Sequence, residues 1–102
     1  MKNTYVADGN GVAVQITGGF YQTFLVGNLG GGTLIVQWSG DNGTTWSTIT
    51  DAISGQSAST TSVGAFNFYA QGGLIRTGLS GSTSPALAAY VGLLYTHNIQ
   101  GQ

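Results

Sequence analysis

The sequence predicts an all-β protein, an antiparallel β-sandwich of about seven or eight strands with a jelly-roll or immunoglobulin-like topology. Its apolar residues fall in short segments rich in Val, Ile, Thr, Phe, Tyr and Trp, the residue types favoured in strands. Within these segments apolar and polar residues alternate with a period of two, so that residues of one kind share one face of the strand. The 18 glycines fall between the segments, at roughly the 8–12-residue spacing of a sandwich or small barrel. No segment shows helical periodicity with capping residues.

The strands are expected in order along the chain, separated by turn residues. Asp8-Gly9-Asn10-Gly11 predicts a hairpin turn, because Gly and Asn tolerate positive φ. The clearest alternation places Leu34, Val36 and Trp38 on one face of their strand. The expected strands are residues 4–7, 12–17, 20–26, 33–38, 45–50, 63–70, 74–79 and 86–96.

Two segments predict how the sheets connect and what covers them. Residues 51–62 are polar and are expected to form an extended crossover between two sheets, as in Greek-key folds. The last strand, residues 86–96, is apolar on both faces. We therefore expect it to be covered on both sides, by a partner chain if not by the domain itself.

The length predicts a single β-sandwich domain over residues 1–102, in which residues 1–5 could form a short N-terminal arm. Residues 1–5 lack the apolar core of a targeting signal, so we expect none there. The longest apolar stretch, residues 86–95, is too short to cross a bilayer as a helix. No membrane partner is therefore expected.

Charged residues are unusually scarce, at 5% of the chain. Two cations far apart in sequence cannot neutralise a phosphate backbone, so the composition argues against nucleic acid binding. A net charge of −1 gives little self-repulsion and permits close association. The absence of cysteine excludes disulfides and thiolate metal sites. The charged side chains are Lys2, Arg76, Asp8, Asp41 and Asp51.

The same inventory predicts no enzyme activity, no cofactor and no metal site. Asp8 and Asp41 lie in Gly-containing turns, where an aspartate side chain caps its own backbone. His97 is the only imidazole and lies next to the end of the last expected strand, and no nucleophile-elbow motif accompanies it. An oxygen-only Ca²⁺ site at a loop with Asp and Asn is the weak alternative for a metal.

One local motif has the pattern S-x-D-x-G-x-T-W, formed by Ser39, Asp41, Gly43, Thr45 and Trp46. The pattern resembles the Asp-box of sialidases and other β proteins. Its logic is structural: Asp41 can accept hydrogen bonds from turn amides, Gly43 can take positive φ, and Trp46 can fold over the hairpin. A chain of 102 residues is too short for a propeller of four-stranded blades. The resemblance therefore implies an Asp-box-like hairpin in this chain but not sialidase activity.

The aromatic residues allow two interpretations. They could fill the core and its edges or lie at subunit contacts. Alternatively, an exposed row of rings on one sheet face could form a stacking platform for sugars. The core interpretation concerns Trp38, Phe24, Phe66 and Phe68, and the platform would come from among Tyr5, Tyr21, Trp46, Tyr69, Tyr90 and Tyr95.

The order of features over residues 32–95 resembles the small β-sandwich proteins of tailed bacteriophages that decorate or cement capsids. The segments that carry this resemblance are Gly32 to Ser39, the Asp-box-like stretch to Trp46, Gly73 to Gly81, and Ala86 to Leu94. The resemblance implies a virion structural protein, made in the host cytoplasm and located on the capsid surface, where it binds the major capsid protein. It also implies a homo-oligomer, such as a trimer.

The surface that contacts the capsid or another subunit is expected at Lys2, Tyr5 and Arg76. Lys2 and Arg76 are the two cations of the chain, and Tyr5 is an aromatic residue close to Lys2 in sequence. The alternative function is a carbohydrate- or receptor-binding module of a phage fibre or tail. An exposed aromatic row would favour that alternative.

Overall fold

The structure is a computed structural model that describes residues 2–50 and 57–96, with side chains as far as residue 93. The described residues form ten strands and no helix. Their bounds in chain order are β1 Lys2–Tyr5, β2 Gly9–Asn10, β3 Val14–Ile16, β4 Gly19–Asn28, β5 Thr33–Ser39, β6 Ser47–Thr48, β7 Ser59–Thr60, β8 Gly64–Ala70, β9 Gly73–Ser80 and β10 Ala86–Thr96.

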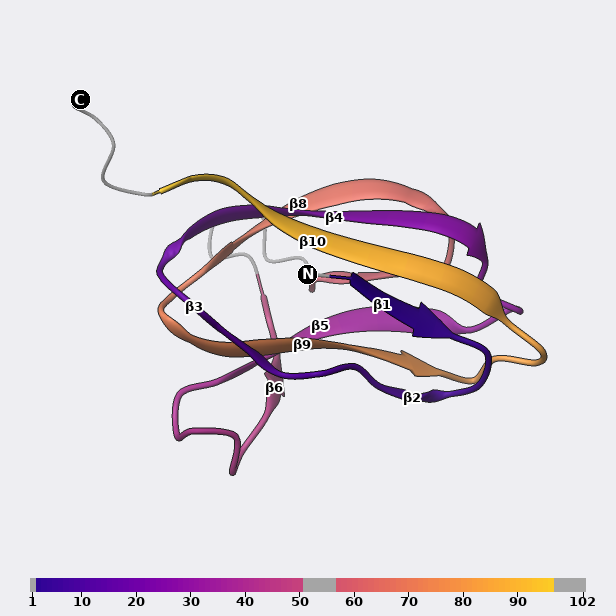
Figure 1. Cartoon of the computed structure of the whole chain (residues 1–102), viewed down its shortest axis with the longest axis horizontal. Coiled ribbons are helices and arrows are strands. Elements are labelled where there is room, and N and C mark those ends of the chain that lie inside the picture. The colour runs from indigo at the N-terminus through magenta and orange to yellow at the C-terminus, as the bar shows by residue number, and fades with distance from the viewer. Residues whose placement is uncertain (1, 51–56, 97–102) are drawn as a thin grey trace.

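The strands form two antiparallel sheets that pack face to face as a β-sandwich, as the sequence predicted (Figure 1). The first sheet has the order β1-β10-β4-β8. The second has the order β2-β9-β5-β6, with β3 also paired to β9 and β7 also paired to β5. The chain crosses between the sheets repeatedly, so most hydrogen-bonded neighbours are far apart in sequence.

The pairings decide between the two predicted topologies. β2 and β3 both pair with β9, and β6 and β7 both pair with β5, so each couple acts as one interrupted strand. Counted in this way there are eight strands, and each strand of the first half of the chain pairs with its counterpart counted back from the C-terminal end. The pairs are β1 with β10, β2 and β3 with β9, β4 with β8, and β5 with β6 and β7. This nested pairing is a long hairpin rolled into two sheets. It is the jelly roll, and it differs from the immunoglobulin arrangement.

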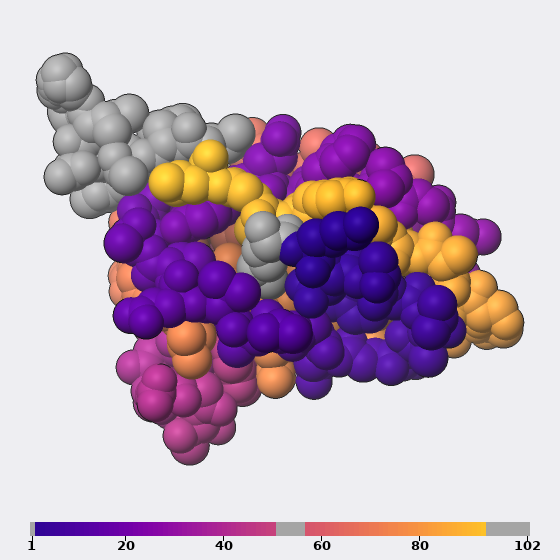
Figure 2. Space-filling model, viewed as in Figure 1, coloured from indigo at the N-terminus to yellow at the C-terminus, as the bar shows by residue number. Residues whose placement is uncertain are grey.

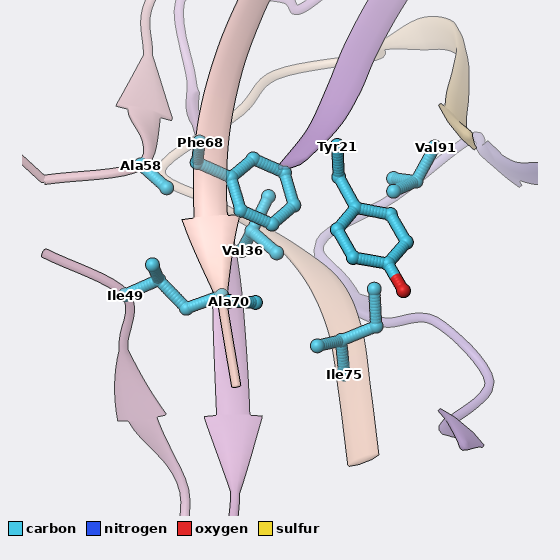
Figure 3. Packing of buried hydrophobic residues seen from close by; sticks show 8 residues of the cluster. All are labelled: Tyr21, Val36, Ile49, Ala58, Phe68, Ala70, Ile75 and Val91. Atoms are coloured by element: carbon cyan, nitrogen blue, oxygen red, sulfur yellow. The ribbon is translucent and has the colours of Figure 1, made fainter. Parts of the chain in front are cut away.

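The core lies between the sheets and divides into two clusters. Figure 3 shows the first, in which the rings of Tyr21 and Phe68 stack with their centroids 5.8 Å apart. Val36 and Ile75 of the second sheet pack against these rings. The second cluster is mainly aliphatic and contains Tyr5, Leu25, Leu29, Leu34, Leu79, Leu87 and Ala89.

The predicted hairpin at residues 8–11 is wrong. β1 pairs with β10 in the first sheet, whereas β2 and β3 pair with β9 in the second, so residues 6–8 carry the chain across. Asp8 does not cap its own turn. Its carboxylate accepts hydrogen bonds from the backbone N–H of Gly81 (3.1 Å) and of Ser82 (3.0 Å), in the loop before β10.

Residues 2–5 are an edge strand instead of a free N-terminal arm, and Met1 lies outside the described residues. Register pairs Lys2 with Tyr90 and Tyr5 with Leu87. The reason is that the Tyr5 ring, 5% exposed, fills the second core cluster and holds the strand in place.

Two further expectations are corrected. Of the predicted crossover at residues 51–62, residues 51–56 lie outside the described part, but Ser59–Thr60 pairs with β5 as strand β7. The chain therefore crosses only at residues 61–63. Phe24 does not fill the core: β4 turns Thr23 and Leu25 inward, which leaves Phe24 46% exposed on the outer side.

Candidate functional site

The Asp-box-like residues all lie in the hairpin between β5 and β6, which projects from the body of the molecule (Figure 1 and Figure 2). The Ser39 hydroxyl donates to Asp41 Oδ1 (2.8 Å) and accepts from the Gly43 N–H (2.8 Å). Asp41 Oδ1 also accepts from the Thr45 N–H (2.8 Å). Asn42 and Gly43 have φ values of 62° and 91°, which Asn and Gly adopt with little strain. The hairpin is thus held by its own side chains.

The electrostatics of the hairpin follow from these bonds. The hydrogen bond from the Thr45 backbone N–H and that from the Ser39 hydroxyl lower the pKa of Asp41 to about 2. Trp46 folds back so that its indole Nε1–H donates to the Gly43 carbonyl (3.1 Å). The Arg76 guanidinium lies 4.2 Å from the centre of the Trp46 ring, a cation–π contact.

The structure separates the three residues expected at a contact surface. Lys2 lies on the outer side of the first sheet, with its Nζ 5.6 Å from the centre of the Tyr90 ring. Arg76 belongs to the second sheet, where its Nε–H donates to Gln37 Oε1 (2.9 Å). Tyr5 is buried between the sheets. These residues therefore do not form one surface.

A surface that the sequence analysis did not single out lies on the outer side of the first sheet. We call it the aromatic face and define it by Phe24, Val26, Ala88 and Tyr90. Register places Phe24 beside Tyr90 and Val26 beside Ala88 across β4 and β10. The rings of Phe24 and Tyr90 lie 6.2 Å apart, and Tyr90 is 37% exposed. Among the described residues that point outward from this sheet, Lys2 carries the only charge.

The aromatic face continues into a shallow hollow of about 350 Å³. Val6 lines it and is among the most exposed apolar side chains that the structure describes. The sequence did carry a signal for this surface, because both faces of residues 86–96 are apolar. Phe24 and Val26 could not be assigned to it until the register of β4 was known.

Two open pockets meet at Trp38, at the end of the sandwich that carries the hairpin. One has a volume of about 300 Å³ and the other about 260 Å³, and Trp38 and Ser47 line both. Tyr69 and Gln71 line the larger pocket, and Asp41 lines the smaller.

The described acidic residues are engaged in holding loops. Asp8 caps the loop between β9 and β10, and hydrogen bonds from the Ser82 hydroxyl and amide lower its pKa. Asp51, one of the five charged residues, and His97, the only imidazole, lie outside the described residues. Within residues 2–50 and 57–96, no group of three or more His, Cys, Asp or Glu residues could hold a metal ion. No helix able to cross a membrane occurs in that same part of the chain.

Comparisons with known proteins return nothing similar: no family model, no curated protein and no solved structure matches this chain. Arguments about function therefore depend on the residues and the geometry described above.

Proposed function

We propose that this chain is a virion structural protein that decorates a tailed-phage capsid and binds its major capsid protein. The observation that carries the proposal is the aromatic face, a sheet surface with exposed Phe24 and Tyr90 and almost no charge. Contiguous apolar surface on a soluble protein commonly marks a site of protein contact. The jelly roll supports the proposal only by analogy, since viral capsid domains use it but so do lectins.

The proposed mechanism of decoration is non-covalent contact through the flat outer surface of the first sheet. Four adjacent strands of four, ten, seven and eleven residues give the first sheet an outer area of roughly 500 Å² at ordinary strand spacing. That is somewhat less than one partner's share of a standard interface, about 800 Å². Many copies on one shell, each self-associated as a homo-oligomer such as a trimer, would add avidity to modest individual contacts. Binding only the assembled shell would stabilise it by mass action.

A co-sedimentation experiment tests the proposal with capsids of the protein's own phage that lack it. The unmodified chain should bind in a fixed ratio to capsid subunits. Phe24→Lys places a charge at the centre of the aromatic face and should abolish binding. Val12→Lys is the matched control, since Val12 is 72% exposed and outside that face, and it should bind normally. Equal binding by both variants, or none by the unmodified chain, would refute the proposal.

A second candidate is a carbohydrate- or receptor-binding module of a fibre or tail. The open pockets at Trp38 favour it, because they combine aromatic rings with hydroxyl and amide groups. Retention on a glycan column without capsid binding would select this candidate over capsid decoration.

A further inference from the structure

We infer that the two pockets at Trp38 form one binding groove for a neutral saccharide. We call it the Trp38 groove; this inference deepens the second candidate function and rests on it. The two pockets have Trp38 and Ser47 in common among their lining residues, which is the observation behind joining them. The larger alone, at about 300 Å³, lies at the lower end of the range for small-molecule sites, roughly 300–1,000 Å³.

The Trp38 side chain is held in a fixed position before any ligand arrives. Its indole Nε1–H donates to the backbone carbonyl of Gln71 (3.1 Å). Gly40 and Gly73 allow the ring to lie close to the backbone, since a Cβ at either position would come within 2.7 Å of it. A ring fixed in this way loses little conformational entropy on binding.

The chemistry around the ring fits a polyhydroxylated ligand. A sugar presents C–H groups on its faces, which pack on an aromatic ring, and hydroxyl groups at its rim. Ser47 offers a hydroxyl that donates and accepts, and Gln71 offers an amide that does both. At the other end of the groove, the Asp41 carboxylate can accept from sugar hydroxyls in addition to its bonds within the hairpin.

The charges select a neutral ligand over an anionic one. Asp41 is the only charged residue among those described as lining the groove. Because the described lining of the groove includes no cation, a carboxylate or phosphate on the ligand would approach Asp41 unpaired and be repelled. We therefore expect uncharged sugars to bind in preference to sialylated or phosphorylated ones.

The fluorescence of Trp38 gives a direct test. The chain has two tryptophans, so Trp46→Phe leaves Trp38 as the only indole reporter. This protein is titrated with maltose, cellobiose, lactose and diacetylchitobiose, and with sialyllactose as the anionic comparison. At least one neutral sugar should give a saturable change at roughly millimolar concentration. Sialyllactose should bind more weakly than lactose.

Variants of the lining residues show where the sugar binds. Gln71→Ala removes an exposed amide, keeps the backbone carbonyl that holds Trp38, and should weaken binding by roughly three- to tenfold. Ser47→Ala removes a hydroxyl that lines both pockets and should also weaken binding. Tyr90→Ala is the matched control on the aromatic face and should leave sugar binding unchanged.

Two results would contradict the assignment of a sugar site to the Trp38 groove. If no neutral sugar in this panel changes the fluorescence of the folded protein, or if Gln71→Ala and Ser47→Ala respond like the unmodified groove, the inference is wrong. Capsid binding is measured separately through Phe24→Lys, which lies outside the groove. The loss of one activity therefore does not imply the loss of the other.

Discussion

The Thr23 side chain is fully buried between the sheets, and its hydroxyl finds no hydrogen-bond partner among the described residues. Its neighbours across the strands are Phe66 and Val91. A buried hydroxyl without a partner loses its bonds to water and gains none in return. Thr23 is therefore a site where the native residue costs stability.

Replacing Thr23 with valine should stabilise the protein. Thr23→Val keeps the branched shape and removes the unpaired hydroxyl, so we expect the free energy of unfolding to rise by about 1 kcal/mol. Urea denaturation measures this change. The control is Thr77→Val, which removes a buried hydroxyl that is hydrogen-bonded and should lower stability instead. A loss of stability in Thr23→Val would show that the hydroxyl has a partner.

At the scale of elements, side-chain bonds tie strands of different sheets together. The Tyr5 hydroxyl of β1 reaches across the sandwich to the hydroxyl of Thr77 on β9. Burial raises the pKa of Tyr5, because an ionised phenol would lose its hydration there. Asn3 strengthens the link, since its amide donates to Thr77 Oγ1 (3.4 Å) and its carbonyl accepts from the Val12 N–H (3.2 Å).

Removing the Tyr5 hydroxyl should weaken the attachment of β1. Tyr5→Phe keeps the ring in the core but deprives the buried Thr77 hydroxyl of one of its two partners, which should cost about 1 kcal/mol. Tyr90→Phe is the matched control on the outer face, and its effect should stay within about 0.5 kcal/mol. Thermal and urea unfolding of the two variants make the comparison. Equal stabilities would mean that the bond contributes nothing net.

The hairpin between β5 and β6 should make the free energy of unfolding depend on pH in the acid range. The folded pKa of Asp41, about 2, lies below its ordinary value of 3.8, so its bonds stabilise the folded state above that ordinary value. This contribution is lost as the pH falls from 3.8 through 2. Asp41→Asn should therefore flatten the decline in stability over this window.

Unfolding curves recorded across the window measure the effect. Asp8→Asn serves as the comparison, since the pKa of Asp8 is also lowered, and the double variant should be flatter than either single one. An unchanged slope in Asp41→Asn would show that the hairpin bonds do not survive in solution.

At the scale of the whole molecule, the scarcity of charge governs association. The chain has five charged side chains, and four of them lie in the described part. Asp8 and Asp41 are occupied with loop amides, and Arg76 is stacked on Trp46. Contacts made by the aromatic face should therefore depend on apolar burial much more than on charge pairing.

Salt dependence tests this expectation. Capsid binding and self-association should change by no more than roughly twofold between low and high salt, because screening has few exposed charges to act on. Sedimentation at about 50 mM and about 500 mM NaCl, roughly one decade in ionic strength, covers the range over which screening changes most. A large loss of binding at high salt would point to Lys2 as the main contact instead of the apolar side chains.

The fold class could be predicted from local signals, because alternation and glycine spacing mark the longer strands without any knowledge of their neighbours. Leu34 and Val36 on one face of β5 were predicted from period two alone, and both are fully buried. The hairpin at residues 39–46 was also visible, since its hydrogen bonds connect residues at most four apart.

Features that depend on register and on long-range pairing could be assigned only from the three-dimensional arrangement of the strands. The jelly-roll order, the burial of Tyr5 and the exposure of Phe24 all follow from which distant strand lies beside which. A shift of one residue exchanges the two faces of a strand, and local pattern cannot fix it where both faces are apolar, as in β4 and β10. The sequence indicated an apolar outer face on residues 86–96, but the partners of that face and the residues of the Trp38 groove could not be assigned from it. Each surface joins residues from several strands that pairing alone brings together.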